Sequence, residues 1–171
     1  MTVTLTPHHA LTFKPESTMS QALHISLLDP ADSATLDAAA AVLVNAFNEP
    51  GRYSVERIRA VLQPVEAPFY RRFYIARLDG EVVGAGGIKA ADWASNTHVL
   101  YLSAVAAQAR GRGIARALVQ ARIDWVRSQY PSGTLLVSTR HRKRFAQLGF
   151  HPLGEAEEFG RTLMMLSLGR K

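Results

Sequence analysis

One stretch of the sequence reads Gln108-Ala109-Arg110-Gly111-Arg112-Gly113-Ile114-Ala115. It joins an apolar, strand-like run over residues 97–105 to a helical pattern over residues 111–129. The first N–H groups of a helix have no partner within the helix, and the helix dipole makes that end positive, so anions bind there. Gly111 and Gly113 place no side chain between the backbone and a bulky diphosphate, while Arg110 and Arg112 add positive charge. The stretch therefore predicts a phosphate-binding loop between a strand and a helix.

The rest of the chain alternates strand-like and helix-like patterns. We predict strands over residues 23–28, 72–78, 81–89, 97–105, 134–139 and 161–168, and helices over residues 33–47, 55–62, 111–129 and 142–148. Asp79-Gly80 predicts a hairpin between two of the strands, and Gly149 a left-handed residue after the last helix. The phosphate-binding loop lies in a strand-helix-strand unit, which predicts one parallel strand pair. The expected fold class is α/β with a mixed sheet.

Length and composition limit the classes of protein to which the chain can belong. At 171 residues it has the length of one domain, and we expect a flexible leader over residues 1–20 and a single domain over residues 21–171. The first residues lack the basic start and apolar block of a secretory signal, and no run is apolar enough for a membrane span. We therefore expect a cytoplasmic protein. The chain has no cysteine, which excludes a disulfide framework, a thiolate metal site and a cysteine nucleophile.

The formal charge of +6 is concentrated in one part of the chain. Residues 93–154 carry nine Lys or Arg and one acid, Asp124, so this segment alone has a charge of +8. Such a segment predicts a polyanionic partner, either nucleic acid or a multiply phosphorylated cofactor. Nucleic acid is the weaker alternative, because stacking aromatic residues are not interleaved with the basic ones.

Two motifs of the sequence, and the spacing between them, resemble those of the GNAT superfamily of acyl-CoA-dependent N-acyltransferases. Gln108-Ala109-Arg110-Gly111-Arg112-Gly113-Ile114-Ala115 matches the pyrophosphate loop of the family, and Leu148-Gly149-Phe150 matches the end of its last short helix. The resemblance extends over residues 23–168. It implies a central mixed sheet of about six or seven strands, splayed between two parallel strands and flanked by about four helices. Acetyl-CoA would lie in the V-shaped opening between these two strands.

The resemblance also implies which residues hold the cofactor. The backbone N–H groups of the loop would bind the pyrophosphate, the strand end before it would pair with the pantetheine arm, and the N–H of Val105 would point at the thioester carbonyl. The cofactor-binding residues expected on this basis are Ala104, Val105, Ala106, Ala107, Arg110, Gly111, Arg112, Gly113, Ile114, Ala115 and Phe145. Whether Arg140, Arg142, Lys143 and Arg144 reach the nucleotide phosphates or form a solvated face is left open.

The chain departs from the family pattern at two positions that matter for catalysis. Many members carry a Tyr four residues before the Gly of Leu-Gly-Phe, where it protonates the departing thiolate, and this chain has Phe145 there. Many members also carry a Glu on the strand before the loop as general base, and this strand has no acid. The usual acid and base are both missing.

Other side chains are candidates for these roles. His98 could replace the Glu because imidazole titrates near neutral pH, although an edge histidine without a catalytic role is the competing interpretation. Tyr101 and Ser103 are expected to share a strand face with Val105, where they either line the acceptor pocket or serve as packing. Ser138 or Tyr101 could supply the proton for the thiolate. The catalytic candidates are thus Val105, His98, Ser138 and Tyr101.

Two further patterns do not indicate a binding site. The histidines show no metal-ligand spacing with carboxylates, so we predict no metal site. Gly84, Gly86 and Gly87 lie inside a strand, which favours a bulge or close packing over a nucleotide loop.

Three functions are compatible with these features. The first is an N-acetyltransferase in which a primary amine attacks bound acetyl-CoA directly. The second is a CoA-binding sensor or regulatory module that has lost catalysis, and the third is nucleic-acid binding. The sequence leaves open whether the acceptor is a small amine or a peptide amine, and it is compatible with a homodimer.

Overall fold

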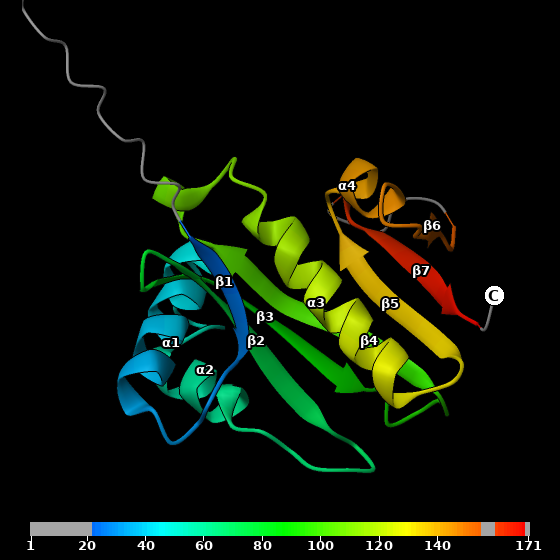
Figure 1. Ribbon diagram of the computed structural model, residues 1–171, viewed down its shortest axis with the longest axis horizontal. Helices are drawn as coiled ribbons and strands as arrows, with labels where there is room; N and C mark the ends of the chain where they lie inside the picture. Colours follow the sequence, from blue (N-terminus) through cyan, green and yellow to red (C-terminus); the bar gives the residue numbers. More distant parts are fainter. Residues whose placement is uncertain (1–21, 155–159, 170–171) are drawn as a thin grey trace, which may run out of the picture.

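The computed structural model describes residues 22–154 and 160–169 and shows a single mixed sheet with helices on both faces (Figure 1). The expected leader lies outside the described residues. The strands are β1 (Leu23–Leu27), β2 (Arg71–Leu78), β3 (Glu81–Ala90), β4 (Thr97–Val105), β5 (Gly133–Thr139), β6 (His151–Pro152) and β7 (Thr162–Leu168). The helices are α1 (Ser33–Phe47), α2 (Val55–Leu62), α3 (Ile114–Gln129), α4 (Arg142–Ala146) and the short 3₁₀ helix η1 (Ala107–Ala109).

The strands form one sheet in the order β1-β2-β3-β4-β5-β7-β6. β4 and β5 run parallel, and every other neighbouring pair is antiparallel. The predicted α/β class, the mixed sheet and the parallel pair are therefore confirmed. The short strand β6 and the helix η1 were not predicted, because two or three residues are too few to show a periodic pattern.

Local sequence signals account for the ends of the first elements. Asp32 caps α1 by accepting a hydrogen bond from the Thr35 N–H at 3.0 Å, and Ser54 caps α2 in the same way. Asp79 and Gly80 have φ angles of 51° and 88°, as a two-residue hairpin turn with two left-handed positions requires. The hairpin between β2 and β3 is confirmed.

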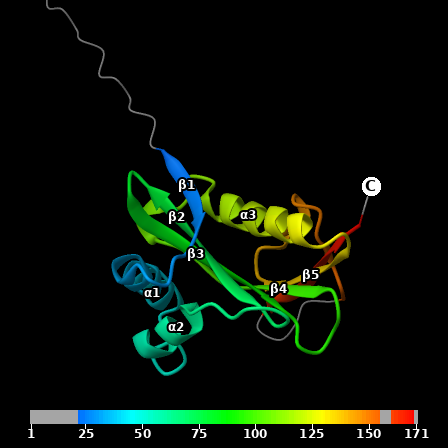
Figure 2. The ribbon, with the colours of Figure 1, turned by 60° about the horizontal axis from the view of Figure 1, so that its bottom comes forward.

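The helices divide between the two faces of the sheet (Figure 2). Helices α1 and α2 pack on one face, against a buried cluster that includes Phe73 and Ile75 of β2. Helix α3 packs on the other face, where Ala76 of the same strand is buried. Helix α4 lies beside β6 and β7. None of the helices in the described parts of the chain is long and apolar enough to cross a membrane.

Helix α3 begins at Ile114, three residues later than predicted. Gly111 and Gly113 have φ angles of 80° and 76°, which lie outside the helical region, so residues 111–113 belong to the loop. Similarly, α4 ends at Ala146 and not at residue 148, and Gly149 follows with the expected positive φ of 90°.

A bulge interrupts the pairing of β3 with β4. The register shifts between Ala85 and Gly87, and Leu102 adopts a left-handed φ of 42°. Tyr101 consequently packs with the α1 and α2 cluster, whereas Val105 packs with the α3 cluster. The expectation that Tyr101 shares a face with Val105 is therefore wrong, because the bulge breaks the alternation of side chains. The glycines of this segment predicted a bulge or close packing, and the structure shows both.

Candidate functional site

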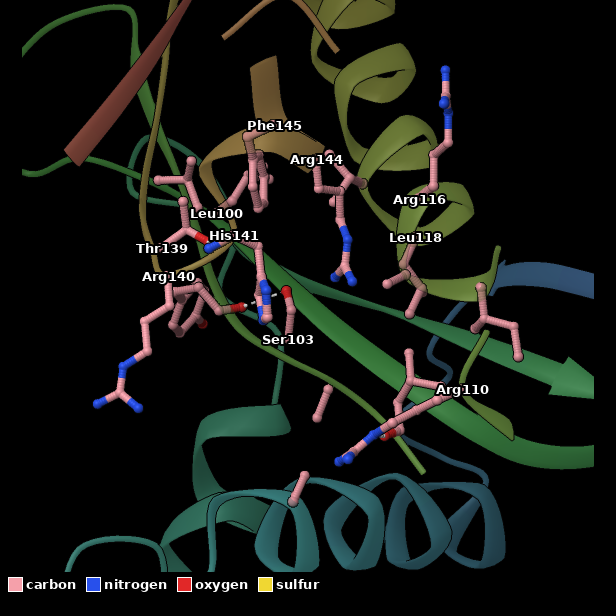
Figure 3. A pocket seen from close by; sticks show the side chains of 18 of the residues that line it. Leu100, Ser103, Arg110, Arg116, Leu118, Thr139, Arg140, His141, Arg144 and Phe145 are labelled. Atoms are coloured by element: carbon pink, nitrogen blue, oxygen red, sulfur yellow. Dashed lines mark hydrogen bonds between the residues drawn. The ribbon is translucent and has the colours of Figure 1, made fainter. Parts of the chain in front are cut away.

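A cavity opens where β4 and β5 separate. The two strands are paired from the Thr97–Thr134 pair to the Leu100–Val137 pair. Beyond Leu100 and Val137, the described structure shows no pairing between them. A cavity of about 630 Å³ lies there, lined by both strand ends, the loop after β4 and the start of α3 (Figure 3). This opening is the splay between parallel strands that the resemblance implied.

The loop presents unobstructed backbone at one wall of this cavity. Gly113 precedes the first turn of α3, and no side chain caps the N–H groups of that turn in the described structure. A Cβ atom at Gly111 or Gly113 would have no neighbour within 4 Å, so both residues face open space. The uncapped, positive end of a 16-residue helix therefore faces the cavity.

Cationic side chains surround the same cavity. Those lining it are Arg110, Arg116, Arg140, Arg144 and Arg161, and its described lining includes no Asp or Glu (Figure 3). Within the basic run, Arg140 and Arg144 line the cavity, whereas Arg142 and Lys143 do not. Arg161 was not singled out from the sequence. The cavity suits a ligand that carries several negative charges.

The register of β4 directs the backbone of Val105 toward the open side. The Ala106 N–H donates to the carbonyl oxygen of Val83 in β3 at 2.8 Å. Because successive residues of a strand point their N–H groups to opposite edges, the N–H of Val105 faces away from β3. Its carbonyl oxygen accepts a hydrogen bond from Nε of Arg110 at 3.3 Å. The edge of β4 beyond the bulge is therefore available to pair with an extended ligand.

Most of the expected cofactor residues lie at this cavity. Ala104, Val105, Arg110, Gly111, Gly113, Ile114, Ala115 and Phe145 line it, whereas Ala106, Ala107 and Arg112 do not. Phe145 is buried and packs edge-to-face against Phe150, so the aromatic ring forms part of the cavity wall.

His98 lies at the opposite end of β4 from the loop. It is only 2% exposed, and its Nδ1 forms a hydrogen bond with the Tyr70 hydroxyl at 2.7 Å. Val105 follows His98 by seven positions along the strand, which corresponds to about 20 Å. Burial lowers the pKa of His98, so the ring is held in its neutral form. The structure does not bring His98 to the cavity.

Tyr101 and Ser138 do line the cavity, in different surroundings. The Tyr101 hydroxyl is buried without a hydrogen-bond partner among the described residues, and burial raises its pKa. The Ser138 hydroxyl accepts a hydrogen bond from Nε of Arg161 at 3.2 Å. The Tyr101 hydroxyl is therefore buried and unpaired among the described residues, whereas the hydroxyl of the half-buried Ser138 is held by Arg161.

Sequence reasoning missed one residue that lines the cavity and one that lies beneath its wall, in contact with Ser103. His141 lines the cavity, and its pKa is lowered by partial burial and then by Arg144, Arg161 and Arg140. Arg122 of α3 is fully buried beneath the bulge. Its position was readable from the sequence, because Arg122 follows Ile114 and Leu118 at the four-residue spacing of a buried helix face.

Comparison with known proteins identifies the family. The model of the acetyltransferase (GNAT) family matches residues 40–150. The chain belongs to the GNAT acetyltransferase family. GNAT acetyltransferases use acetyl-CoA as the acyl donor, and as a member of this family the protein is an acyltransferase. No match was found among curated proteins.

Solved GNAT structures share the fold of this chain. The aminoglycoside 6'-N-acetyltransferase from Enterococcus faecium superposes with a TM-score of 0.71 at 16% identity, over 86% of this chain and 98% of that one. The ribosomal-protein-S18-alanine N-acetyltransferase from Escherichia coli gives 0.67 at 18% identity, over 88% and 96%. An acyl-CoA N-acyltransferase from Pseudomonas aeruginosa gives 0.66 at 15% identity, over 84% and 99%. The GNAT-like sheet and helices predicted from the sequence are confirmed.

No cluster of three or more His, Asp or Glu side chains capable of holding a metal ion occurs within the described residues.

Proposed function

We propose that this GNAT protein transfers an acetyl group from acetyl-CoA to a primary amine by direct attack in a ternary complex. The observation that carries the proposal is the cavity between β4 and β5, which joins an uncapped helix N-terminus to an unpaired strand edge and a ring of arginines. An acyl-CoA has one chemical part to match each of these three features. Its pyrophosphate suits the helix N-terminus, its extended amide-bearing arm suits the strand edge, and its further phosphate charge suits the arginines.

In this proposal the loop and the strand edge hold the donor. The N–H groups of residues 110–115 bind the pyrophosphate, with the α3 dipole adding favourable potential. The backbone of residues 104–107 pairs with the pantetheine arm, and the Val105 N–H donates to the thioester oxygen. Because charge develops on that oxygen only during the reaction, a donor already in place stabilises the transition state.

The reaction needs a neutral amine and a route for its protons. The amine nitrogen bonds to the thioester carbon, the C–S bond breaks, and the electron pair remains on sulfur. His141 is the histidine that lines the cavity among the described residues, and its lowered pKa keeps it neutral. We assign it the role of proton acceptor from the incoming ammonium, which the missing Glu would otherwise fill. The nitrogen releases its second proton to water as the amide forms. The absence of cysteine fits direct attack without an acyl-enzyme.

The acceptor is proposed to enter from the side of α2. A second cavity of about 630 Å³ lies there, and Tyr101 lines both cavities. Arg52 and Arg57 also line the second cavity, whose described lining includes no acidic side chain. An acceptor panel should therefore contain amines matched in size with and without a carboxylate.

Release of CoA, measured with acetyl-CoA and this amine panel, tests the proposal. We expect turnover above the hydrolytic background with at least one amine, and an acetylated product of the corresponding mass. Arg127→Ala, which removes an exposed charge on α3 away from the cavity, should leave turnover unchanged. Tight binding of acetyl-CoA with no transfer to any amine would overturn the proposal and support the regulatory alternative.

A further inference from the structure

Arg122 is a buried cation that the reaction proposed above does not use. Its side chain is 0% exposed. Nε donates to the carbonyl oxygen of Leu118 at 2.8 Å, and Nη1 donates to the carbonyl oxygen of Gly87 at 2.9 Å and to Oγ of Ser103 at 2.7 Å. Among the described residues, no carboxylate forms an ion pair with it. Burial lowers its pKa to about 9, so the guanidinium remains charged at neutral pH with only neutral partners.

The backbone around the guanidinium leaves space for it. A Cβ atom at Gly86 would lie 2.8 Å from Cζ of Arg122, closer than contact distance. The register shift beside Gly87 and the left-handed φ of Leu102 bring the Gly87 carbonyl and the Ser103 hydroxyl to the same nitrogen. Since a buried cation without a counter-ion is costly, this arrangement favours a role that uses positive charge.

Ser103 connects this charge to the cavity. Its side chain lines the cavity and, in the view of Figure 3, lies between His141 and Arg110. Its oxygen accepts from Arg122, so its own O–H is free to donate elsewhere. The acceptor in reach is the Tyr101 carbonyl oxygen at 3.5 Å, which is the limit for a weak hydrogen bond. A hydroxyl that accepts from a cation is also a stronger donor, because hydrogen bonds in a chain polarise one another.

We propose that Arg122 is a positioning residue that holds Ser103 so that the Ser103 hydroxyl donates a hydrogen bond to the sulfur of CoA as it becomes a thiolate. The inference rests on the proposed function. As the C–N bond forms and the C–S bond breaks, the electron pair stays on sulfur, and the hydrogen bond and the nearby charge stabilise it. Ser103 keeps its proton, because an alkoxide is a stronger base than a thiolate. Water protonates the thiolate after the acetyl group has left.

The Ser103 hydroxyl would take the role of the tyrosine hydroxyl that many family members carry at the position of Phe145. The phenyl ring has no hydroxyl to serve the departing sulfur, whereas Ser103 offers one from the opposite strand, β4. Stabilising the thiolate by a charge-assisted hydrogen bond performs the same task as protonating it, since both disfavour return of the electron pair to the carbonyl carbon.

Titration of the thiol of protein-bound CoA tests this inference without an acceptor. Thiolate formation is followed by ultraviolet absorbance against the complex with desulfo-CoA, and calorimetry on the same samples measures CoA affinity. The variants are Ser103→Ala, Ser103→Thr and Arg122→Met, with Arg127→Met as the matched control for loss of an α3 charge. We expect the bound thiol pKa to rise by about one unit in Ser103→Ala and in Arg122→Met. We expect Ser103→Thr and Arg127→Met to leave it unchanged.

Each other outcome overturns the inference. An unchanged thiol pKa in Ser103→Ala excludes the serine, and an unchanged value in folded Arg122→Met excludes the arginine. If Arg122→Met does not fold, Ser103→Ala against Ser103→Thr decides whether the hydroxyl acts on sulfur. Wild-type protein that does not bind CoA would overturn the proposed function itself. CoA binding with the thiol pKa of free CoA would overturn the role of Ser103 and Arg122 alone.

Discussion

Nε of Arg110 donates a hydrogen bond of 3.3 Å to the carbonyl oxygen of Val105, which ties the last residue of β4 to the loop that precedes α3. This contact links the two parts of the proposed donor site, the strand edge and the phosphate-binding loop. Arg110 also lines the cavity, so its charge faces the proposed phosphates.

Replacing Arg110 should therefore weaken donor binding more than loss of one surface charge would. For Arg110→Ala we expect CoA affinity to fall about 10- to 100-fold, the range for a hydrogen bond to a charged group. Calorimetry with CoA measures it. Arg127→Ala is the control for net charge, and an equal loss of affinity in both variants would contradict a specific contact.

A methyl group added at Gly113 should lower both the stability of the fold and the affinity for CoA. In Gly113→Ala the Cβ meets no atom within 4 Å, but the φ of 76° costs an L residue about 1–2 kcal/mol. We expect this loss of stability in urea unfolding, together with a fall in CoA affinity of more than tenfold because the methyl group enters the phosphate site. Gly51→Ala, which also has no neighbour within 4 Å and no positive φ, should change neither quantity. Unchanged CoA affinity in Gly113→Ala would place the pyrophosphate elsewhere.

Gly86 should tolerate no side chain while Arg122 is in place. The added Cβ would lie 2.8 Å from Cζ of a guanidinium fixed by its hydrogen bonds, so Gly86→Ala should cost about 1–3 kcal/mol of stability. Urea unfolding measures the loss. In the Arg122→Met background the same substitution should cost less, because the longer cationic group is gone. An equal cost in both backgrounds would show that the strain does not arise from Arg122.

His141 should control the acidic side of the pH–rate profile. Its pKa is lowered, mainly by partial burial and then by neighbouring arginines. The imidazole therefore stays neutral to a pH below 6.5, the ordinary pKa of histidine. We expect kcat/KM to fall only when the pH drops below that value, and His141→Gln to reduce kcat/KM about 100-fold and remove this limb. The rate is measured as CoA release at amine concentrations well below KM, where it reports kcat/KM. A limb that persists in His141→Gln would assign it to another group.

The elements that carry a repeated pattern were predictable from the sequence, and so was the loop. The strand-like run to Val105, the glycines after it and the Leu-Gly-Phe motif predicted the parallel unit, and most of the cofactor-binding residues expected from them line the cavity. These features are local, so each can be read from a short window of sequence.

The features that were missed depend on contacts between distant residues. The glycines of β3 indicated a bulge or close packing, but they did not show that side chains of β4 would change face, because that change depends on pairing with β3 and on the space that Arg122 occupies. His98 was considered as a base because histidine titrates near neutral pH, whereas its distance from the loop follows from the length of β4. His141 reaches the cavity only because β5 and β4 lie side by side.

His98 should make the fold sensitive to acid. Its Nδ1 forms a hydrogen bond with the Tyr70 hydroxyl, and its Nε2 has no hydrogen-bond partner among the described residues. A second proton on the ring would therefore be buried without an acceptor. The folded-state pKa is lowered, so the unfolded chain binds the proton more readily. Stability should therefore be fully present above about pH 6.5 and decrease below it, by at most about 1.4 kcal/mol per pH unit for this one proton. Urea unfolding across this pH range should show a shallower decrease in His98→Gln than in His141→Gln, since the less buried His141 contributes less. Equal slopes in wild type and His98→Gln would show that the acid sensitivity has another source.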